Sequence, residues 1–255
     1  MGIGFFRRAR IASEAFLDIE NWREVLPRAA AGEAVTEIRL RDGSVITAPP
    51  ENMLWPIFSN TWYHSSYTKH CRIPRNAVVV DVGANVGVFS LFASRVARLV
   101  YSLEPASQNF SRLVSNVSRR RNTVPLRLAC AARDGRAVLN LSGEPIAFSL
   151  KTDACQGEQE MVDVISLSSL FDRYKISRCD FLKLDCEGSE FDIILGSEPS
   201  LFERITRIVL EYHDHLSDKF SHYDLLRRLE SLGFRATAYD PNGNHGMIAA
   251  VRLRQ

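Results

Sequence analysis

The chain has 255 residues, of which 45% are hydrophobic and 24% are charged, and its formal net charge is +2. This is the composition of a globular protein that is long enough to bury a sizeable core. A nearly neutral chain gives no broad electrostatic basis for binding nucleic acid. No apolar run reaches the ~18 residues that a membrane span requires.

The cysteines are few, odd in number and dispersed. There are 5 of them, and no two form a C-x-x-C pair. This argues against a disulfide framework and against a structural zinc site. We therefore expect a protein of the reducing cytoplasm.

The N-terminal part has a helical pattern followed by a hairpin pattern. Residues 1–31 predict one or two helices, with Pro27 near a break. Basic and aromatic residues mix at 5–10, so we expect a helix that packs on the domain or, alternatively, makes a weak membrane-surface contact. Residues 35–47 alternate apolar and polar side chains around Asp42-Gly43, which predicts a β-hairpin.

Residues 49–76 are irregular in pattern and rich in proline, tryptophan, tyrosine and histidine. Such a segment either lines a binding pocket or anchors itself to the core through its aromatic rings, and the sequence leaves both open. If it lines the pocket, Trp55, Trp62 or Tyr63 could stack on a sugar. We expect residues 1–76 to form a helical and hairpin extension, a substrate or lid segment, and residues 77–255 to form the main domain.

From residue 78 onward, predicted strands alternate with predicted helices. The helices are expected at 87–97, 106–120, 189–197 and 221–233, with a short one in the second half of 161–174. Two consecutive strands are expected at the C-terminus. The polar stretch 143–160 is expected to be a loop beside the pocket. The strands are expected at 78–81, 98–105, 125–132, 136–142, the first half of 161–174, 179–185, 204–214, 234–240 and 245–253.

This order predicts an α/β fold with a mainly parallel, doubly wound sheet and one antiparallel strand.

The turn after the first of these strands, VVVDVGANVG at 78–87, suggests a ligand. No lysine follows Gly87, so it is not a P-loop, and the glycine register does not fit the dinucleotide fingerprint. Asp81 before the glycines would repel a pyrophosphate but attract the ammonium group of S-adenosylmethionine. Glu104 ends the next strand, where an acid can accept both ribose hydroxyls.

Four segments, VVVDVGANVGVFSLFAS, YSLEP, DFLKLDCEGSEFDIILG and IVLEYH, resemble the FkbM-type methyltransferases over about residues 75–215. The resemblance implies the Rossmann-like fold of class I methyltransferases, S-adenosylmethionine as donor, and usually O-methylation of sugars or other hydroxylated small molecules. It also implies donor contacts from Asp81, Gly83, Ala84, Asn85, Gly87, Glu104, Pro105, Ala131 and Asp185.

Acids and a histidine gather at two predicted strand ends. Asp185 and Glu187 end the strand at 179–185, and Glu211 and His213 end the strand at 204–214. A sugar hydroxyl is a poor nucleophile, so it needs a general base or a metal. We predict these four residues as catalytic, with Asp185 or His213 as the base.

The same four residues are oxygen-rich with one histidine, a set that suits Mg²⁺ or Mn²⁺. Their spacing is not a metal motif, and we therefore predict no metal site.

The sequence also allows two other functions. The chain could be a catalytically idle module that binds S-adenosylmethionine or a protein partner, or an enzyme that uses NAD or a nucleotide sugar. The intact acids and His213 favour a transferase that acts on a small acceptor, expected to be a carbohydrate. The pattern names neither the acceptor nor an oligomeric state.

Overall fold

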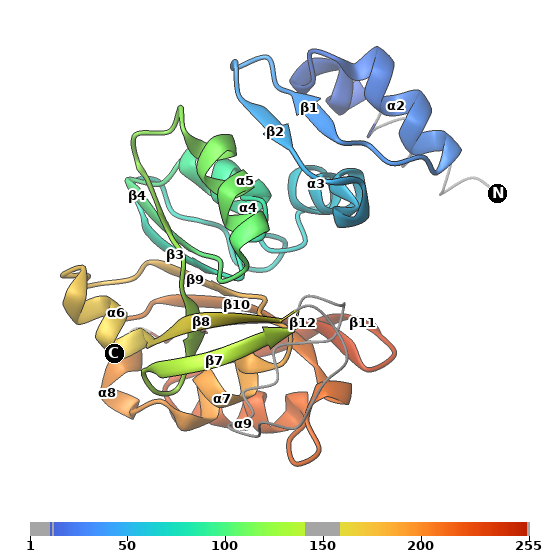
Figure 1. The fold of residues 1–255 in the computed structure, drawn as a ribbon. Helices are drawn as coiled ribbons and strands as arrows, with labels where there is room; N and C mark the ends of the chain where they lie inside the picture. Colours follow the sequence, from blue (N-terminus) through green and yellow to red (C-terminus); the bar gives the residue numbers. More distant parts are fainter. Residues whose placement is uncertain (1–10, 12, 141–158, 254–255) are drawn as a thin grey trace.

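In the computed structural model, the described part of the chain comprises residues 11, 13–140 and 159–253. A seven-stranded sheet forms its centre (Figure 1). In spatial order the strands are β11 (Phe234–Asn242), β12 (His245–Arg252), β10 (Arg207–His213), β9 (Phe181–Leu184), β3 (Val78–Val82), β4 (Leu99–Leu103) and β5 (Thr123–Leu126).

Only β12 runs against its neighbours in this sheet. It pairs antiparallel with β10 and β11, whereas β10, β9, β3, β4 and β5 are parallel to one another. The predicted doubly wound sheet with one antiparallel strand is therefore confirmed.

Helices cover both faces because side chains alternate along each strand. Val78, Val80 and Val82 of β3 pack in one core with the helices of the C-terminal half. Val79 packs on the opposite face with helix α4 (Val88–Ser94). The other helices of the domain are α5 (Ser107–Val117), α6 (Leu167–Arg173), α7 (Ser189–Gly196), α8 (Pro199–Glu203), the 3₁₀ turn η2 (Asp214–Leu216) and α9 (His222–Ser231).

The helix predicted at 221–233 is confirmed as α9, and its two ends have typical capping residues. Ser221 and Asp224 form a capping box at its start, and Gly233 follows its end with a φ of 82°.

A smaller sheet contains β6 (Ala129–Ala131), β8 (Gln159–Ser166) and β7 (Gly135–Asn140). The prediction of one strand over 125–132 is wrong. The chain turns after Leu126, whose carbonyl accepts from the N–H of Leu128. As a result β5 stays beside β4 in the large sheet, and β6 pairs with β8 in the small one. The expected loop at 143–160 lies largely outside the described residues.

The N-terminal extension lies against α4 (Figure 1). It contains α2 (Trp22–Ala31), the hairpin of β1 (Glu37–Arg39) and β2 (Val45–Thr47), the 3₁₀ turn η1 (Pro50–Asn52) and α3 (Leu54–Trp62). The predicted hairpin is confirmed. Residues 1–10, which carried the alternative of membrane contact, lie outside the described residues.

Two expectations for the extension are wrong. Pro27 lies inside α2 and does not break it, because a proline removes one helix hydrogen bond while Val25 and its neighbours hold the helix to the core. Residues 49–76 are not irregular throughout, since they contain α3. Phe58, Trp62 and Tyr63 pack with α4 in a buried cluster, so these aromatic residues anchor the segment.

Within the described residues, no helix combines the length and apolar character needed to cross a membrane.

Candidate active site

One face of the large sheet changes from apolar to polar at its carboxyl edge. Along β10, Val209 is apolar, and the next two residues on its face are Glu211 and His213. The strand register places Asp81 of β3 beside Lys183 of β9. Because strand side chains repeat every two residues, the charges collect at the edge where ligands bind in such folds.

Asp81 is engaged inside the protein. Its side chain is 0% exposed. One oxygen accepts from Ser90 Oγ at 2.6 Å, and the other lies 3.1 Å from Lys183 Nζ. Burial alone would lower the pKa of Lys183, but Asp81 and Asp185 raise it above its ordinary value. Lys183 is therefore a fixed cation, and it also donates to the carbonyl of Gly83 at 2.7 Å.

The glycine turn is shaped by close contact with the chain itself. A Cβ at Gly83 would lie 1.8 Å from the carbonyl oxygen of Asp185, and the φ of Gly83 is 75°. Gly87 has a φ of 89°, and a Cβ there would lie 2.7 Å from Leu113. Only glycine fits such positions without strain, so the turn can press against the end of β9.

Glu104 braces the same turn. Its carboxylate accepts from the N–H of Asn85 at 2.8 Å and from the N–H of Ala106 at 3.0 Å. Burial raises the pKa of Glu104 to about 7, against these two hydrogen bonds, which lower it. Each oxygen keeps a second lone pair for a donor such as a ribose hydroxyl.

His213 lies among carboxylates and hydrogen bonds to none of them. Its Nε2 is 3.7 Å from Glu187 and 4.0 Å from Glu211, and its Nδ1 is 3.8 Å from Glu190. Burial would lower the pKa of His213, but these acids raise it to about 9. Burial, and then the charge of Asp185, raises the pKa of Glu211 to about 7.

At neutral pH the free protein therefore carries a proton on His213, and the charge of Glu211 changes near pH 7.

Glu190 has a structural position beneath this cluster. It is 0% exposed and accepts from the N–H groups of Cys186 and Gly188 at 2.6 and 2.7 Å. It closes the turn between β9 and α7 and faces the histidine ring from below. Its two hydrogen bonds keep Glu190 in place.

Asp185 is held by a residue that the sequence did not single out for this contact. Tyr67, from the segment after α3, donates to Asp185 Oδ2 at 2.7 Å, and Lys183 Nζ lies 3.5 Å from the same oxygen. The tyrosine ring also lies over Lys183, at 5.3 Å from Nζ. An aromatic residue before the first core strand is a weak signal, because strand order alone does not place it over the sheet edge.

These residues surround a pocket of about 410 Å³. The turn residues Gly83, Ala84 and Asn85 line one side of it, and Asp185, Glu187, Glu211 and His213 line another, so the pocket brings together all four predicted catalytic residues. The extension and the β11–β12 hairpin complete the wall with Ile57, Asn60, Thr61, Ser66, Tyr67, Asp240, Asn242, His245 and Met247.

Other predicted site residues lie apart from this pocket. Among the described residues, Trp55, Trp62 and Tyr63 do not line it, and Trp55 borders a separate hollow with Leu26 and His64. The predicted donor residues Asp81, Gly87, Glu104, Pro105 and Ala131 are also absent from its wall. Glu104 follows the end of β4 and contacts the turn through Asn85. Ala131 ends β6 and packs with Ala106 in the core of the smaller sheet.

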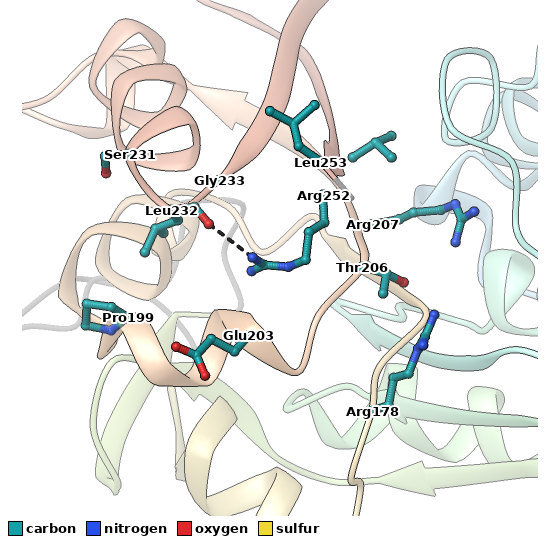
Figure 2. Close-up of a pocket in the computed structure, with 11 residues that line it drawn as sticks. Arg178, Pro199, Glu203, Thr206, Arg207, Ser231, Leu232, Gly233, Arg252 and Leu253 are labelled. Carbon is teal, nitrogen blue, oxygen red and sulfur yellow. Dashed lines mark hydrogen bonds between the residues drawn. The ribbon is translucent and has the colours of Figure 1, made fainter. Parts of the chain in front are cut away.

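A second pocket, of about 900 Å³, lies at the opposite edge of the sheet. It is lined by Arg207, the first residue of β10, and by Arg252, the last residue of β12 (Figure 2). Arg252 donates to the backbone carbonyls of Ile205, Leu232 and Phe202. The guanidinium is therefore used to join chain segments.

The site fits S-adenosylmethionine at several points. Gly83 and Ala84 line the pocket without bulky side chains, so a ligand can approach the turn closely. Glu104 keeps lone pairs for hydroxyl groups, and Asp185 and Glu211 offer negative charge toward a cationic donor. A metal ion also has candidate ligands, because one ligand atom from each of Asp185, Glu187 and His213 lies within 4.8 Å of the others.

Comparison with known proteins defines the class and then the family. The fold resembles that of fibrillarin in a fibrillarin/Nop5p complex, with a TM-score of 0.50 and 13% sequence identity over 83% of this chain and 95% of that one. The likeness supports a Rossmann-like fold. The family described as "Methyltransferase FkbM domain" matches residues 81–236. The chain belongs to this family, so it is a methyltransferase, and its donor is S-adenosylmethionine.

Named relatives are distant in sequence. The "31-O-demethyl-FK506 methyltransferase FkbM" of Streptomyces tacrolimicus is 27% identical over 218 residues, covering 71% of this chain and 83% of that protein. The "hexuronic acid methyltransferase AglP" of Haloferax volcanii is 27% identical over 143 residues, covering 56% and 58%.

The "AMB antimetabolite synthetase AmbE" of Pseudomonas aeruginosa is 26% identical over 225 residues. These cover 72% of this chain, and the chain spans 11% of the length of AmbE.

Proposed function

We propose that this methyltransferase transfers a methyl group from S-adenosylmethionine to a hydroxyl group of a small polyhydroxylated acceptor, such as a sugar or glycoconjugate. One observation carries the proposal, namely that a single pocket joins the glycine turn to the acids and histidine at two neighbouring strand ends. The relative from Streptomyces is named as a 31-O-demethyl-FK506 methyltransferase and the one from Haloferax as a hexuronic acid methyltransferase, and these names support an oxygen acceptor.

The donor is assigned to the turn side of the site. Gly83, Ala84 and Asn85 would contact it through their backbone, and Glu104 would accept the ribose hydroxyls, with Pro105 and Ala131 beside the adenine. Asp81 would act through Lys183, since its carboxylate is already bonded to Ser90 and lies against that lysine. Gly87 would support the turn from behind, where it packs on Leu113.

The donor brings a methyl group on a cationic sulfur. In the transfer, a bond forms between the acceptor oxygen and this methyl carbon, the carbon–sulfur bond breaks with its electron pair going to sulfur, and the hydroxyl proton goes to a base. Glu211 is the best-placed base, because it faces the pocket and hydrogen bonds to no described residue. Asp185 is less free, since Tyr67 and Lys183 hold it.

The acceptor is assigned to the side formed by the extension and the β11–β12 hairpin. Asn60, Ser66, Asn242 and His245 line the pocket there, and such groups suit hydrogen bonds to hydroxyls. Residues 1–76 would thus serve as a substrate segment on the domain formed by 77–255.

The cytoplasmic location is part of the proposal and rests on the cysteines. Cys71, Cys130, Cys179 and Cys186 are buried free thiols, a state that a reducing compartment preserves.

Ligand binding and product analysis test the function. S-adenosylmethionine and S-adenosylhomocysteine should raise the melting temperature, whereas NAD and ATP should not. At 100 times its dissociation constant, a ligand adds ~2.7 kcal/mol to the free energy of unfolding. Incubation with a methyl-labelled donor and a panel of sugars should give a labelled O-methyl product. Donor binding without transfer to any hydroxylated compound would overturn the acceptor assignment and favour a binding module.

A further inference from the structure

The acids of the pocket exceed the cations that balance them. The described wall contains Asp185, Glu187, Glu211 and Asp240. Lys69 pairs with Asp240 at 2.7 Å, and Lys183 is bound to Asp81 and the Gly83 carbonyl. At the ends of β9 and β10, Asp185, Glu187, Glu190 and Glu211 surround the single histidine His213. The cluster therefore keeps an excess of negative charge even with His213 protonated, an arrangement that attracts a cation.

Three side chains of this cluster converge with the spacing of metal ligands. One atom from each of Asp185, Glu187 and His213 lies within 4.8 Å of the others. Ligands bind Mg²⁺ at about 2.0–2.1 Å, so two atoms on one ion are about 3 Å apart at right angles and about 4.2 Å apart on opposite sides. Glu187 is an exposed side chain, so it can close the remaining few tenths of an ångström by rotation.

The imidazole of His213 is a second and separate observation. The residue is only 8% exposed, and its Nδ1, which lies 3.8 Å from Glu190 on the side away from the pocket acids Glu187 and Glu211, is buried without a hydrogen-bond partner among the described residues. Its Nε2 stands 3.7 Å from Glu187 and 4.0 Å from Glu211. These distances are too long for hydrogen bonds, but they are the separations expected when a nitrogen and an oxygen bind the same ion.

Asp185 also keeps one carboxylate oxygen free to bind a metal ion. Tyr67 and Lys183 both contact Oδ2 of Asp185, while Oδ1 accepts no hydrogen bond from the described part of the chain. The carboxylates around the imidazole ring also attract a metal cation.

We propose that Asp185, Glu187 and His213 bind one divalent cation of the Mg²⁺ or Mn²⁺ type. Two carboxylates and one imidazole are the ligands that such an ion accepts, and its other positions would stay open. Because all three residues line the pocket, such an ion would lie at the pocket wall, where it would make a bound acceptor hydroxyl lose its proton to the base more readily. This last role rests on the proposed function, whereas ion binding itself does not.

Calorimetric titration of the metal-free 255-residue protein with Mn²⁺ alone tests the proposal. The expected result is one saturable site per chain, weakened at least tenfold in Glu187→Gln and in His213→Ala. Glu203→Gln is the matched control, because Glu203 is an equally exposed glutamate at the other edge of the sheet, and it should bind Mn²⁺ as the parent does. Absence of saturable binding, or equal binding in all variants, overturns the proposal.

A second titration separates the two proposals. S-adenosylhomocysteine added to the metal-free protein measures binding at the donor site alone, because the proposed ion contacts the acceptor and not the donor. Circular dichroism of each variant shows that it is folded. Methyl transfer that withstands removal of all metal ions would also contradict the ion's role, while leaving the methyltransferase assignment intact.

Discussion

The two ends of β10 differ in size and in chemistry. At its first residue, Arg207, lies a pocket of about 900 Å³, and at its last, His213, lies one of about 410 Å³. In the larger pocket Arg252 is bonded to backbone carbonyls (Figure 2) and Arg178 to Asp180. In the smaller one the side chains of His213 and Glu211 hydrogen bond to no described residue. Volume therefore does not mark the site, and unengaged titratable groups do.

The largest expected effect separates two glutamates, one at each end. Glu211→Gln should reduce kcat by about 10²–10⁴-fold, the usual contribution of a general base, or about 3–5 kcal/mol of transition-state stabilisation. Glu203→Gln makes the same change of charge beside the larger pocket and should leave kcat within twofold. Steady-state kinetics with a responsive acceptor give the comparison, and a kcat near that of the parent in Glu211→Gln would remove Glu211 as the base.

Next in size is the effect of filling the glycine turn. Gly83→Ala adds a Cβ that would lie 1.8 Å from the carbonyl of Asp185, at a backbone conformation that costs other residues about 1–2 kcal/mol. With overpacking of about 1–3 kcal/mol, we expect a loss of about 3 kcal/mol in the free energy of unfolding.

Gly135→Ala is the control for that loss, since no atom lies within 4 Å of its added Cβ. Urea denaturation should show a small change in either direction for this variant. Equal midpoints for the two alanine variants would mean that the turn can relax away from β9.

The charged residues at the carboxyl edge of the sheet were easier to predict from the sequence than the residues that pack around them. The two-residue period along β9 and β10 sufficed to expect Asp185, Glu211 and His213 at one edge. Tyr67 belongs to the aromatic segment at 49–76, for which lining a pocket was one of two interpretations, and it does line the pocket. Its contact with Asp185 was not predicted, because that contact depends on how a segment outside the sheet crosses over it. Helix α3 was also misjudged, since its aromatic side chains fit an irregular loop as well as a helix and the packing against α4 decides between them.

The break between β5 and β6 was missed for a similar reason. The run at 125–132 is apolar with small residues and fits a single strand. Pairing with two different partners, β4 and β8, separates it into two sheets. Local pattern cannot supply this information, because the partner strands lie far away in the sequence.

A third effect, of intermediate size, concerns pH and Glu104. Its folded pKa of about 7 lies above the ordinary value of about 4.3 for a glutamate. The folded state therefore holds a proton that the unfolded state lacks. The stability from this group is fully present below about pH 4.3 and is lost as the pH rises through 7. Its contribution to the free energy of unfolding should fall by about 1.4 kcal/mol per pH unit within that window.

The measurement is the difference between the parent and Glu104→Gln in urea denaturation from pH 5 to pH 8. Donor affinity should change in the opposite sense, because only the ionised carboxylate accepts two hydroxyl donors. S-adenosylhomocysteine should bind the parent more tightly as the pH rises through 7. A pH-independent affinity in the parent would argue against a ribose contact.

The smallest effect on stability gives the finest test of the two ends. Lys69 pairs with Asp240 across the smaller pocket, and Arg178 pairs with Asp180 beside the larger one, both as partly exposed pairs. Lys69→Met and Arg178→Met should each cost at most about 1 kcal/mol of stability. Only Lys69→Met should raise the KM for the acceptor, by a few-fold with kcat unchanged, because it frees Asp240 in the pocket wall. Equal KM values in both variants would show that the contact between the extension and the hairpin does not shape the acceptor site.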